Sequence, residues 1–215
     1  MTERRKRRNT RRYVGIKTDP KHRKYIGKEW DLLGAHQLSF LVQMGMREHH
    51  NLLDIGCGSF RGGRFLLMYL QPGHYFGVEP EKWLVDDGIK HEVSQGLVDL
   101  KQPCIHFDGD ADFSWFKAEF DYVLAHSILI HANLAWIEKC FKEVKKVLKP
   151  DGMFLANVRF RSIDDTGLEW DYPTNRRYRL ETFKRIAEEA GLKMEVLDVP
   201  HLHGPRQKWI KVVHA

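Results

Sequence analysis

Two glycines and an aspartate stand close together in the run LLDIGCGSFRGG, which covers residues 52–63. Gly56 and Gly58 permit a tight turn that lets a ligand approach the backbone, and a helix starting after them offers amide donors. A dinucleotide site would have a third glycine where this chain has Arg61, and Asp54 would repel a pyrophosphate. The acid favours a ligand with a cationic end. The alternative is a tight turn that binds nothing.

Acids also follow two later apolar stretches, in the strings YFGVEP and HFDGD. The carboxylate of Glu79 is either a ligand-binding group or an exposed acid before Pro80. Asp108 is a second candidate ligand, but Asp108, Asp110 or Asp112 can equally cap a short helix near residue 111. These acids are therefore candidates for binding a polar small molecule.

Two histidines follow the apolar stretch FDYVLA. Histidine titrates near neutral pH and suits a general base, so His126 and His131 are the candidate catalytic residues. The alternative for each is a hydrogen-bonded histidine at the rim of a pocket.

These candidates need elements that bring them to one place, and apolar stretches alternate with amphipathic ones along the chain. Strands are predicted at residues 51–55, 75–78, 105–107, 121–125, 153–160, 192–196 and 208–213, and helices at 30–46, 65–70, 83–93, 134–149 and 180–190. Alternating strands and helices imply a mainly parallel sheet covered on both faces, with ligands at the carboxyl ends of the strands.

The strings named so far resemble, in order and spacing, the motifs of the class I S-adenosylmethionine (SAM)-dependent methyltransferases. FDYVLAHSILIH is similar to their fourth-strand motif, and VLKPDGMFL to the passage into their fifth strand. The resemblance covers about residues 50–160 and implies an α/β fold: a doubly wound, mainly parallel seven-stranded sheet. More loosely, GKEWDLLGAHQLSFL and HGPRQKW resemble bacterial members that modify small molecules and glycans.

This resemblance implies SAM as the cofactor and assigns roles to the acids. Glu79 would accept the ribose hydroxyls, Asp108 would reach the adenine amino group, and Asp54 would lie near the amino-acid end. The expected cofactor-binding residues are Asp54, Gly56, Cys57, Gly58, Glu79, Pro80, Asp108 and His126.

Four further side chains are candidates for the cofactor site. Arg61 or Arg64 would hold the cofactor carboxylate or lie on a solvated helix face. Trp30 and Gln37 would cover the cofactor, or Trp30 would simply pack in the core.

The acceptor is expected on the loop at residues 161–178, which has no periodic pattern and resembles a substrate lid. We expect Arg159, Trp170 and Tyr172 to bind the acceptor. Their mixture with acids suits a small polar molecule or glycan, methylated on oxygen or nitrogen.

The net charge of +6 lies at one end of the chain. Residues 1–12 hold seven Lys or Arg and one Glu, and the rest holds 28 basic and 28 acidic residues. We therefore divide the chain into a disordered basic tail at 1–12, a helical cap at 13–50 and a SAM-binding domain at 51–215. The tail could recruit an RNA or protein substrate, or only aid solubility. A SAM-binding partner protein without catalysis is a further alternative.

Composition also predicts the cellular localisation of the protein. No apolar run approaches the length of a membrane span, and no apolar segment follows the basic residues as in a secretory signal. The cysteines form no disulfide framework, which favours the cytoplasm. No metal site is predicted, because neither His49-His50 nor His201-x-His203 has a further ligand at zinc-like spacing. The sequence does not predict an oligomeric state.

Overall fold

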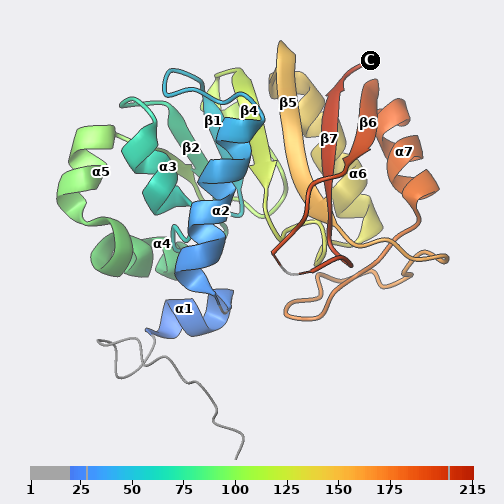
Figure 1. Ribbon diagram of the computed structural model, residues 1–215, viewed down its shortest axis with the longest axis horizontal. Coiled ribbons are helices and arrows are strands. Elements are labelled where there is room, and N and C mark those ends of the chain that lie inside the picture. The colour runs from blue at the N-terminus through green and yellow to red at the C-terminus, as the bar shows by residue number, and fades with distance from the viewer. Residues whose placement is uncertain (1–19, 28, 203) are drawn as a thin grey trace, which may run out of the picture.

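The computed structural model describes residues 20–27, 29–202 and 204–215 (Figure 1). The basic tail predicted at residues 1–12 lies outside these residues.

One seven-stranded sheet forms the centre of the molecule, in the order β3-β2-β1-β4-β5-β7-β6. All neighbouring strands are parallel except β7, which is antiparallel to both β5 and β6. The predicted fold class, a doubly wound and mainly parallel seven-stranded sheet, is confirmed. The strands are β1 (Leu52–Ile55), β2 (Tyr75–Val78), β3 (Cys104–His106), β4 (Phe120–Ala125), β5 (Leu148–Val158), β6 (Leu192–Leu197) and β7 (Lys208–His214).

The helices connect these strands and cover both faces of the sheet (Figure 1). They are α1 (Lys21–Ile26), α2 (Trp30–Gln43), α3 (Gly63–Tyr69), α4 (Lys82–Gly88), α5 (Gln95–Lys101), α6 (Leu134–Val147) and α7 (Leu180–Glu189), with a π-helical turn η1 (Ile89–Val93) and a 3₁₀ turn η2 (Ser114–Phe116).

Several elements of the structure differ from the predicted ones. The single helix predicted at 83–93 is α4 followed by the π turn. Helix α5 was not predicted, because none of its residues is fully buried and it has no clear apolar face. Strand β5 begins at Leu148, directly after α6, where it pairs with Phe120 before a register shift.

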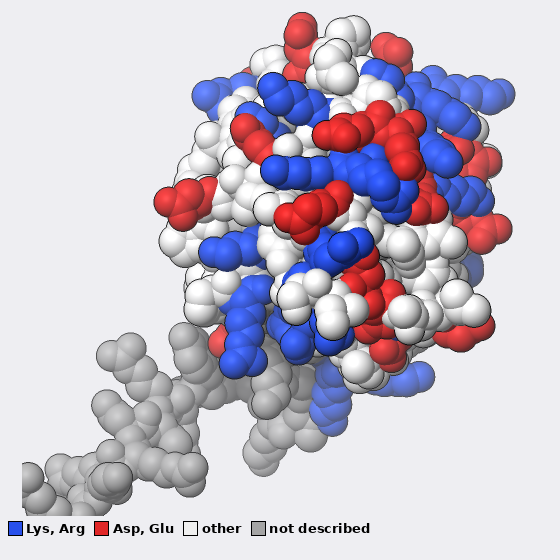
Figure 2. Space-filling model, turned by 90° about the vertical axis from the view of Figure 1, so that its right-hand side faces the viewer, with Lys and Arg blue, Asp and Glu red and all other residues white. Residues whose placement is uncertain are grey.

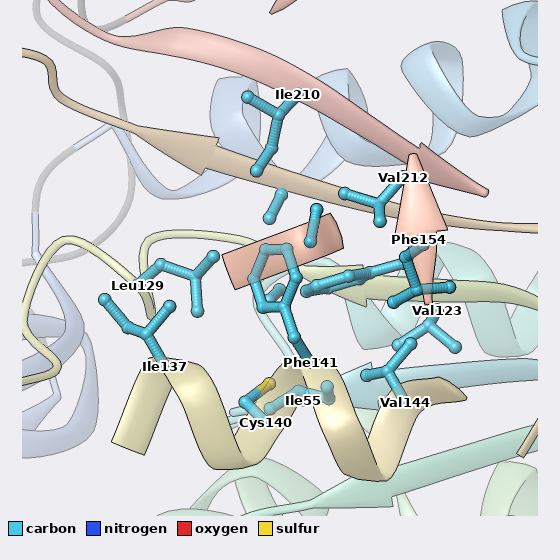
Figure 3. Close-up of a cluster of buried hydrophobic side chains, with 14 of the residues drawn as sticks. Ile55, Val123, Leu129, Ile137, Cys140, Phe141, Val144, Phe154, Ile210 and Val212 are labelled. Carbon is cyan, nitrogen blue, oxygen red and sulfur yellow. The ribbon is translucent and has the colours of Figure 1, made fainter. Parts of the chain in front are cut away.

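Two hydrophobic clusters hold the layers together, one on each face of the sheet. On one face, α6 places residues three or four positions apart against the strands, and Phe141 packs edge-on against Phe154 at 5.4 Å between ring centroids (Figure 3). Helix α7 adds Phe183 and Ile186 to this cluster. The opposite face packs against α2, α3 and α4 and includes the stacked pair Phe40 and Trp209.

The order of the strands decides where a ligand can bind. The chain builds β2 and β3 on one side of β1 and then crosses to β4 on the other side. The connections after β1 and β4 therefore leave in opposite directions, which opens a crevice at their carboxyl ends.

The surface of the folded body carries charges of both signs. On the face nearest α7 and β6, basic and acidic side chains lie intermixed (Figure 2). Among the described residues, no helix is long and apolar enough to cross a membrane. The three cysteines are free thiols: Cys57, Cys104 and Cys140.

Candidate active site

A cavity of about 670 Å³ opens where β1, β2, β3 and β4 end, a size typical of small-molecule sites. Most of the predicted site residues line it: Asp54, Gly56, Cys57, Gly58, Glu79, Pro80, Asp108, His126, His131, Trp170 and Tyr172. Arg159 does not line the cavity and lies outside it, at the end of β5.

The glycine turn after β1 forms the base of the cavity. Gly56 and Gly58 have φ angles of +72° and +56°, in the left-handed region that glycine adopts without strain. A Cβ atom on Gly58 would lie 2.8 Å from Ile26 Cδ1, and one on Gly56 would lie 2.1 Å from Ile128 Cδ1. The turn therefore needs glycine both for its backbone angles and for space.

Glu79 follows β2 and faces this turn. Its side-chain oxygens accept hydrogen bonds from the backbone amides of Gly58 and Glu81, each at 3.0 Å. Burial raises its pKa to about 6. The backbone thus fixes a carboxylate at the cavity wall, ready to accept hydrogen bonds from a ligand.

Asp54 is buried at the end of β1, and its Oδ2 accepts a hydrogen bond from the hydroxyl of Tyr75 at 2.7 Å. Burial raises its pKa to about 6. A buried acid with one side-chain hydrogen bond among the described residues is suited to a partly cationic ligand. Cys57, in the same turn, has a pKa raised by burial, so its thiol stays protonated and unreactive.

Asp108 lines the cavity and also closes its own loop. Its two oxygens accept hydrogen bonds from the backbone amides of Asp110 at 3.0 Å and Asp112 at 2.9 Å. Asp112, in turn, accepts hydrogen bonds from the amide and hydroxyl of Ser114 at the start of η2. Capping is therefore the role of Asp112, while Asp108 shapes the wall of the cavity.

Arg61 is buried in the turn before α3 and lines the cavity. Its Nη2 lies 3.3 Å from Nδ1 of His126, its Nε has no hydrogen-bond partner among the described residues, and it forms no ion pair there. Burial lowers its pKa to about 10, so it remains a cation at neutral pH. The interpretation of Arg61 as a solvated helix residue is wrong. Arg64 is held in ion pairs with Asp31 and Glu92.

The protonation of the two candidate histidines follows from their neighbours. Nδ1 of His131 lies 2.6 Å from the carbonyl oxygen of Thr174, which can only accept, so Nδ1 carries the proton and Nε2 keeps a lone pair. Burial lowers the pKa of His131 below its ordinary value. Nδ1 of His126, by contrast, accepts from the guanidinium of Arg61.

The loop at residues 161–178 is folded over the segment after β4. Arg176 is buried within it, forming an ion pair with Asp165 at 2.7 Å and donating from Nε to the carbonyl oxygen of Glu169 at 3.1 Å. The amide of Arg176 also donates to the carbonyl oxygen of Ile130 at 2.7 Å. This arginine therefore organises the loop that carries Trp170 and Tyr172.

Aromatic rings from three distant segments form the outer part of the cavity. Tyr172 lies 4.9 Å from His131 and 5.1 Å from Tyr25 between ring centroids, and its hydroxyl donates to the carbonyl oxygen of Tyr25. Trp170 packs edge-on against Trp136 at 5.6 Å. Among these, Tyr25 and Trp136 were not predicted as site residues.

The sequence signal for Tyr25 is weak, because α1 has only six residues and no period can be read from it. The helix is held in place by Glu92 of the π turn, which accepts from Arg23 Nε at 2.6 Å and lies 2.9 Å from His22 Nε2. The position of Tyr25 over the cavity thus depends on the ion pair between Arg23 and Glu92, which are 69 residues apart in the sequence.

The two remaining candidates for covering the cofactor, Gln37 and Trp30, lie in different places. Gln37 of α2 lines the cavity, whereas Trp30 is buried against α1, with its ring 5.5 Å from that of His22. Within the described residues, no group of three or more histidine, cysteine or acidic side chains is arranged to hold a metal. His203, part of the His201-x-His203 pair, lies outside the described residues.

Comparison with known proteins agrees with this geometry. A methyltransferase domain family matches residues 53–154. The curated sterol 24-C-methyltransferase erg6 of Aspergillus fumigatus is 24% identical over 152 residues, which cover 70% of this chain and 38% of the relative. The chain thus spans about two fifths of the length of that relative.

Solved structures share the fold. The CcbJ methyltransferase from Streptomyces caelestis superposes with a TM-score of 0.67 at 15% identity, over 88% of this chain and 98% of the other. Magnesium protoporphyrin IX methyltransferase from Synechocystis PCC 6803, solved with bound S-adenosylhomocysteine (SAH), gives 0.65 at 12% identity, over 86% and 83%. The matched domain, the strand order and the motifs around the cavity make this chain similar to the class I SAM-dependent methyltransferases, in agreement with the resemblance of its sequence motifs.

Proposed function

We propose that this protein transfers a methyl group from SAM to oxygen or nitrogen of a small polar acceptor. The observation that carries the proposal is a single cavity lined both by a backbone-fixed carboxylate, Glu79, and by a histidine with its lone pair available, His131. When bound, the cofactor supplies an electrophilic methyl group carried on a sulfonium.

The chemistry of the cavity fits the parts of this cofactor. Glu79 would accept hydrogen bonds from the ribose hydroxyls, since the turn at Gly58 holds its carboxylate at the wall of the cavity. Asp108 and Pro80 would border the adenine. Asp54 would attract the amino group, and Arg61, a buried cation without an ion pair in the described residues, would hold the carboxylate.

The glycine turn would let the cofactor approach the backbone closely. Cβ atoms at Gly56 and Gly58 would occupy space beside the cavity, and Cys57 offers only a small neutral thiol there. His126 would contact the cofactor and keep Arg61 in position through its Nδ1.

Among the candidate bases, we favour His131. Its Nδ1 proton is held by Thr174, and its lowered pKa keeps Nε2 unprotonated at neutral pH. As an acceptor hydroxyl or amine forms its bond to the methyl carbon, the bond between that carbon and sulfur breaks and its electron pair leaves with SAH. The proton of the acceptor moves to Nε2 of His131. His126 is less suited, because protonating its Nδ1 would place two cations side by side with Arg61.

The acceptor is expected against the aromatic side chains at the mouth of the cavity. Trp170 and Tyr172 are partly exposed there and offer flat faces to a ring or a sugar. The names of the relatives above include a sterol and a magnesium porphyrin as substrates, which supports a small-molecule acceptor as a class.

A screen of small polar acceptors with SAM, read by mass spectrometry, tests this proposal. We expect a product heavier by one methylene, formed about 10²- to 10⁴-fold more slowly by His131→Gln, with SAH affinity retained. The matched variant His126→Gln should change SAH affinity more than His131→Gln does. Equal turnover by wild type and His131→Gln would contradict the role of His131. The absence of any product from a SAM-binding protein would favour the non-catalytic alternative.

A further inference from the structure

Three arginines from separate segments meet at the carboxyl end of β5. A parallel bridge between Phe160 and Tyr178 sets Arg159 beside Arg177, and the amide of Tyr178 donates to the carbonyl oxygen of Arg159 at 3.3 Å. On the other side of β5, Val158 pairs with Lys208 in antiparallel register. Arg206 lies two residues before Lys208, in the turn that leads into β7. We call Arg159, Arg177 and Arg206 the arginine cluster.

The positive charge of this cluster is not balanced within the described part of the chain. None of its three members forms an ion pair there, and Nε of Arg159 is buried without a hydrogen-bond partner. Burial lowers the pKa of Arg159, and the charges of Arg177 and Arg206 lower it further. Arg177 and Arg206 therefore each lie within electrostatic reach of Arg159.

The acids of the neighbouring loop do not neutralise the cluster. Asp164 is paired with Arg179 and Asp165 with Arg176. Glu169 lines the cavity, and Asp171 is tied by its amide to the carbonyl oxygen of His131. Both of these remaining acids lie on the side of the proposed base.

The cluster is also near the site of the reaction. The charge of Arg159 contributes to the lowered pKa of His131, after the larger effect of burial. Strand β5 is the neighbour of β4, whose end carries His126. A molecule held by the cluster at the rim can therefore reach the mouth of the cavity.

We propose that the arginine cluster binds a phosphoryl group of the acceptor, so that the substrate is a small phosphate ester or diphosphate. The proposal rests on the function proposed above and narrows its substrate class. A phosphate ester carries close to two negative charges and offers several oxygens to guanidinium groups, whereas a carboxylate would leave more of the cluster uncompensated. Bound there, the phosphoryl group would hold the acceptor with its hydroxyl or amine toward His131.

Calorimetric titration of inorganic pyrophosphate into the SAH-saturated protein tests this inference, since bound SAH keeps the probe out of the cofactor subsite. We expect binding that weakens with salt and is about tenfold weaker or worse in the double variant Arg159→Gln, Arg177→Gln. The matched control is Arg185→Gln, because Arg185 pairs with Glu138 and Glu189 on α6 and α7 and should leave binding unchanged.

Two outcomes would overturn the inference: equal pyrophosphate affinity in wild type and the double variant, or tighter binding of malonate than of pyrophosphate. Titration of SAH into the same proteins is read separately. If SAH affinity is retained and the double variant binds pyrophosphate as tightly as wild type, the role of the arginine cluster is overturned and the proposed function stands. If wild type does not bind SAH, the proposed function itself is overturned.

Discussion

The two halves of the cavity are built in different ways. The half that we propose binds the cofactor, called the cofactor half, consists of the turns after β1, β2 and β3, and its key contact joins the amide of Gly58 to the carboxylate of Glu79. The half that we propose binds the acceptor, called the acceptor half, joins α1, the segment after β4 and the loop at 161–178, held by side chains such as Arg176 and Tyr172. A site made of backbone turns tolerates few changes, whereas a site made of side-chain contacts can change its specificity without losing its cofactor.

The largest effect that follows from this difference is expected at Gly58. In Gly58→Val, a β-branched side chain would have to adopt a φ of +56° and would contact Ile26. We expect SAH affinity, measured by calorimetry, to fall on the order of 100-fold. The matched control is Gly73→Val, which has a φ of +81° but open space around it, away from the cavity. Gly73→Val should lose stability and keep its SAH affinity. An equal loss of SAH affinity in both variants would contradict the role of the turn at Gly58.

A somewhat smaller effect is expected for Asp54, through the pH dependence of stability. Its pKa is about 6 in the folded protein and 3.8 ordinarily, so the folded state holds a proton that the unfolded state releases. The free energy of unfolding should therefore fall as pH rises from about 4 through 6, by roughly 2–3 kcal/mol from this group. Urea unfolding of Asp54→Asn should show a flatter profile than wild type. If the free energy of unfolding depends on pH in the same way in both proteins, Asp54 is not desolvated in the folded state.

In the acceptor half, Arg176→Ala removes the ion pair with Asp165 and the hydrogen bond to Glu169. Because Asp165 is partly exposed, we expect a loss of about 1–3 kcal/mol in stability. The KM for the acceptor should rise about tenfold while SAH affinity stays within twofold, since the cofactor turns are untouched. An equal loss of SAH affinity would show that the halves are coupled.

The smallest effect is expected for Tyr172→Phe, which removes only the hydroxyl that donates to the carbonyl of Tyr25. The aromatic packing against His131 remains. We expect kcat/KM to fall a few-fold, in line with a single hydrogen bond at a partly exposed site. Tyr172→Ala, which removes the whole ring, is the matched larger change and should lower kcat/KM further. Identical kinetics of the two variants would place the acceptor away from this ring.

The sequence predicted the cofactor half better than the acceptor half, for a physical reason. Glu79 directly follows β2 and Gly58 lies three residues after β1, so strand prediction and the parallel sheet bring them to one edge. Tyr25 belongs to a six-residue helix whose position depends on Glu92, a contact that no local pattern predicts. Arg159 was predicted from its place at the end of a strand, but it does not line the cavity.

The helices show the same limit. The amphipathic spacing of α6 and α7 is regular, and both were predicted close to their observed bounds. Helix α5, without a fully buried residue, has no such spacing, and the π turn before it interrupts the period of α4. Patterns therefore predict the elements that build the core, and miss those that only connect or cover it.

The central claim is that Glu79, fixed by the turn at Gly58, binds the cofactor. Calorimetric titration of SAH into wild type, Glu79→Gln and Glu79→Ala tests it most directly. We expect one site of roughly micromolar affinity, weakened on the order of 10- to 100-fold in Glu79→Ala and less in Glu79→Gln, which keeps an oxygen acceptor. No binding to wild type, or equal affinity in all three proteins, would contradict it.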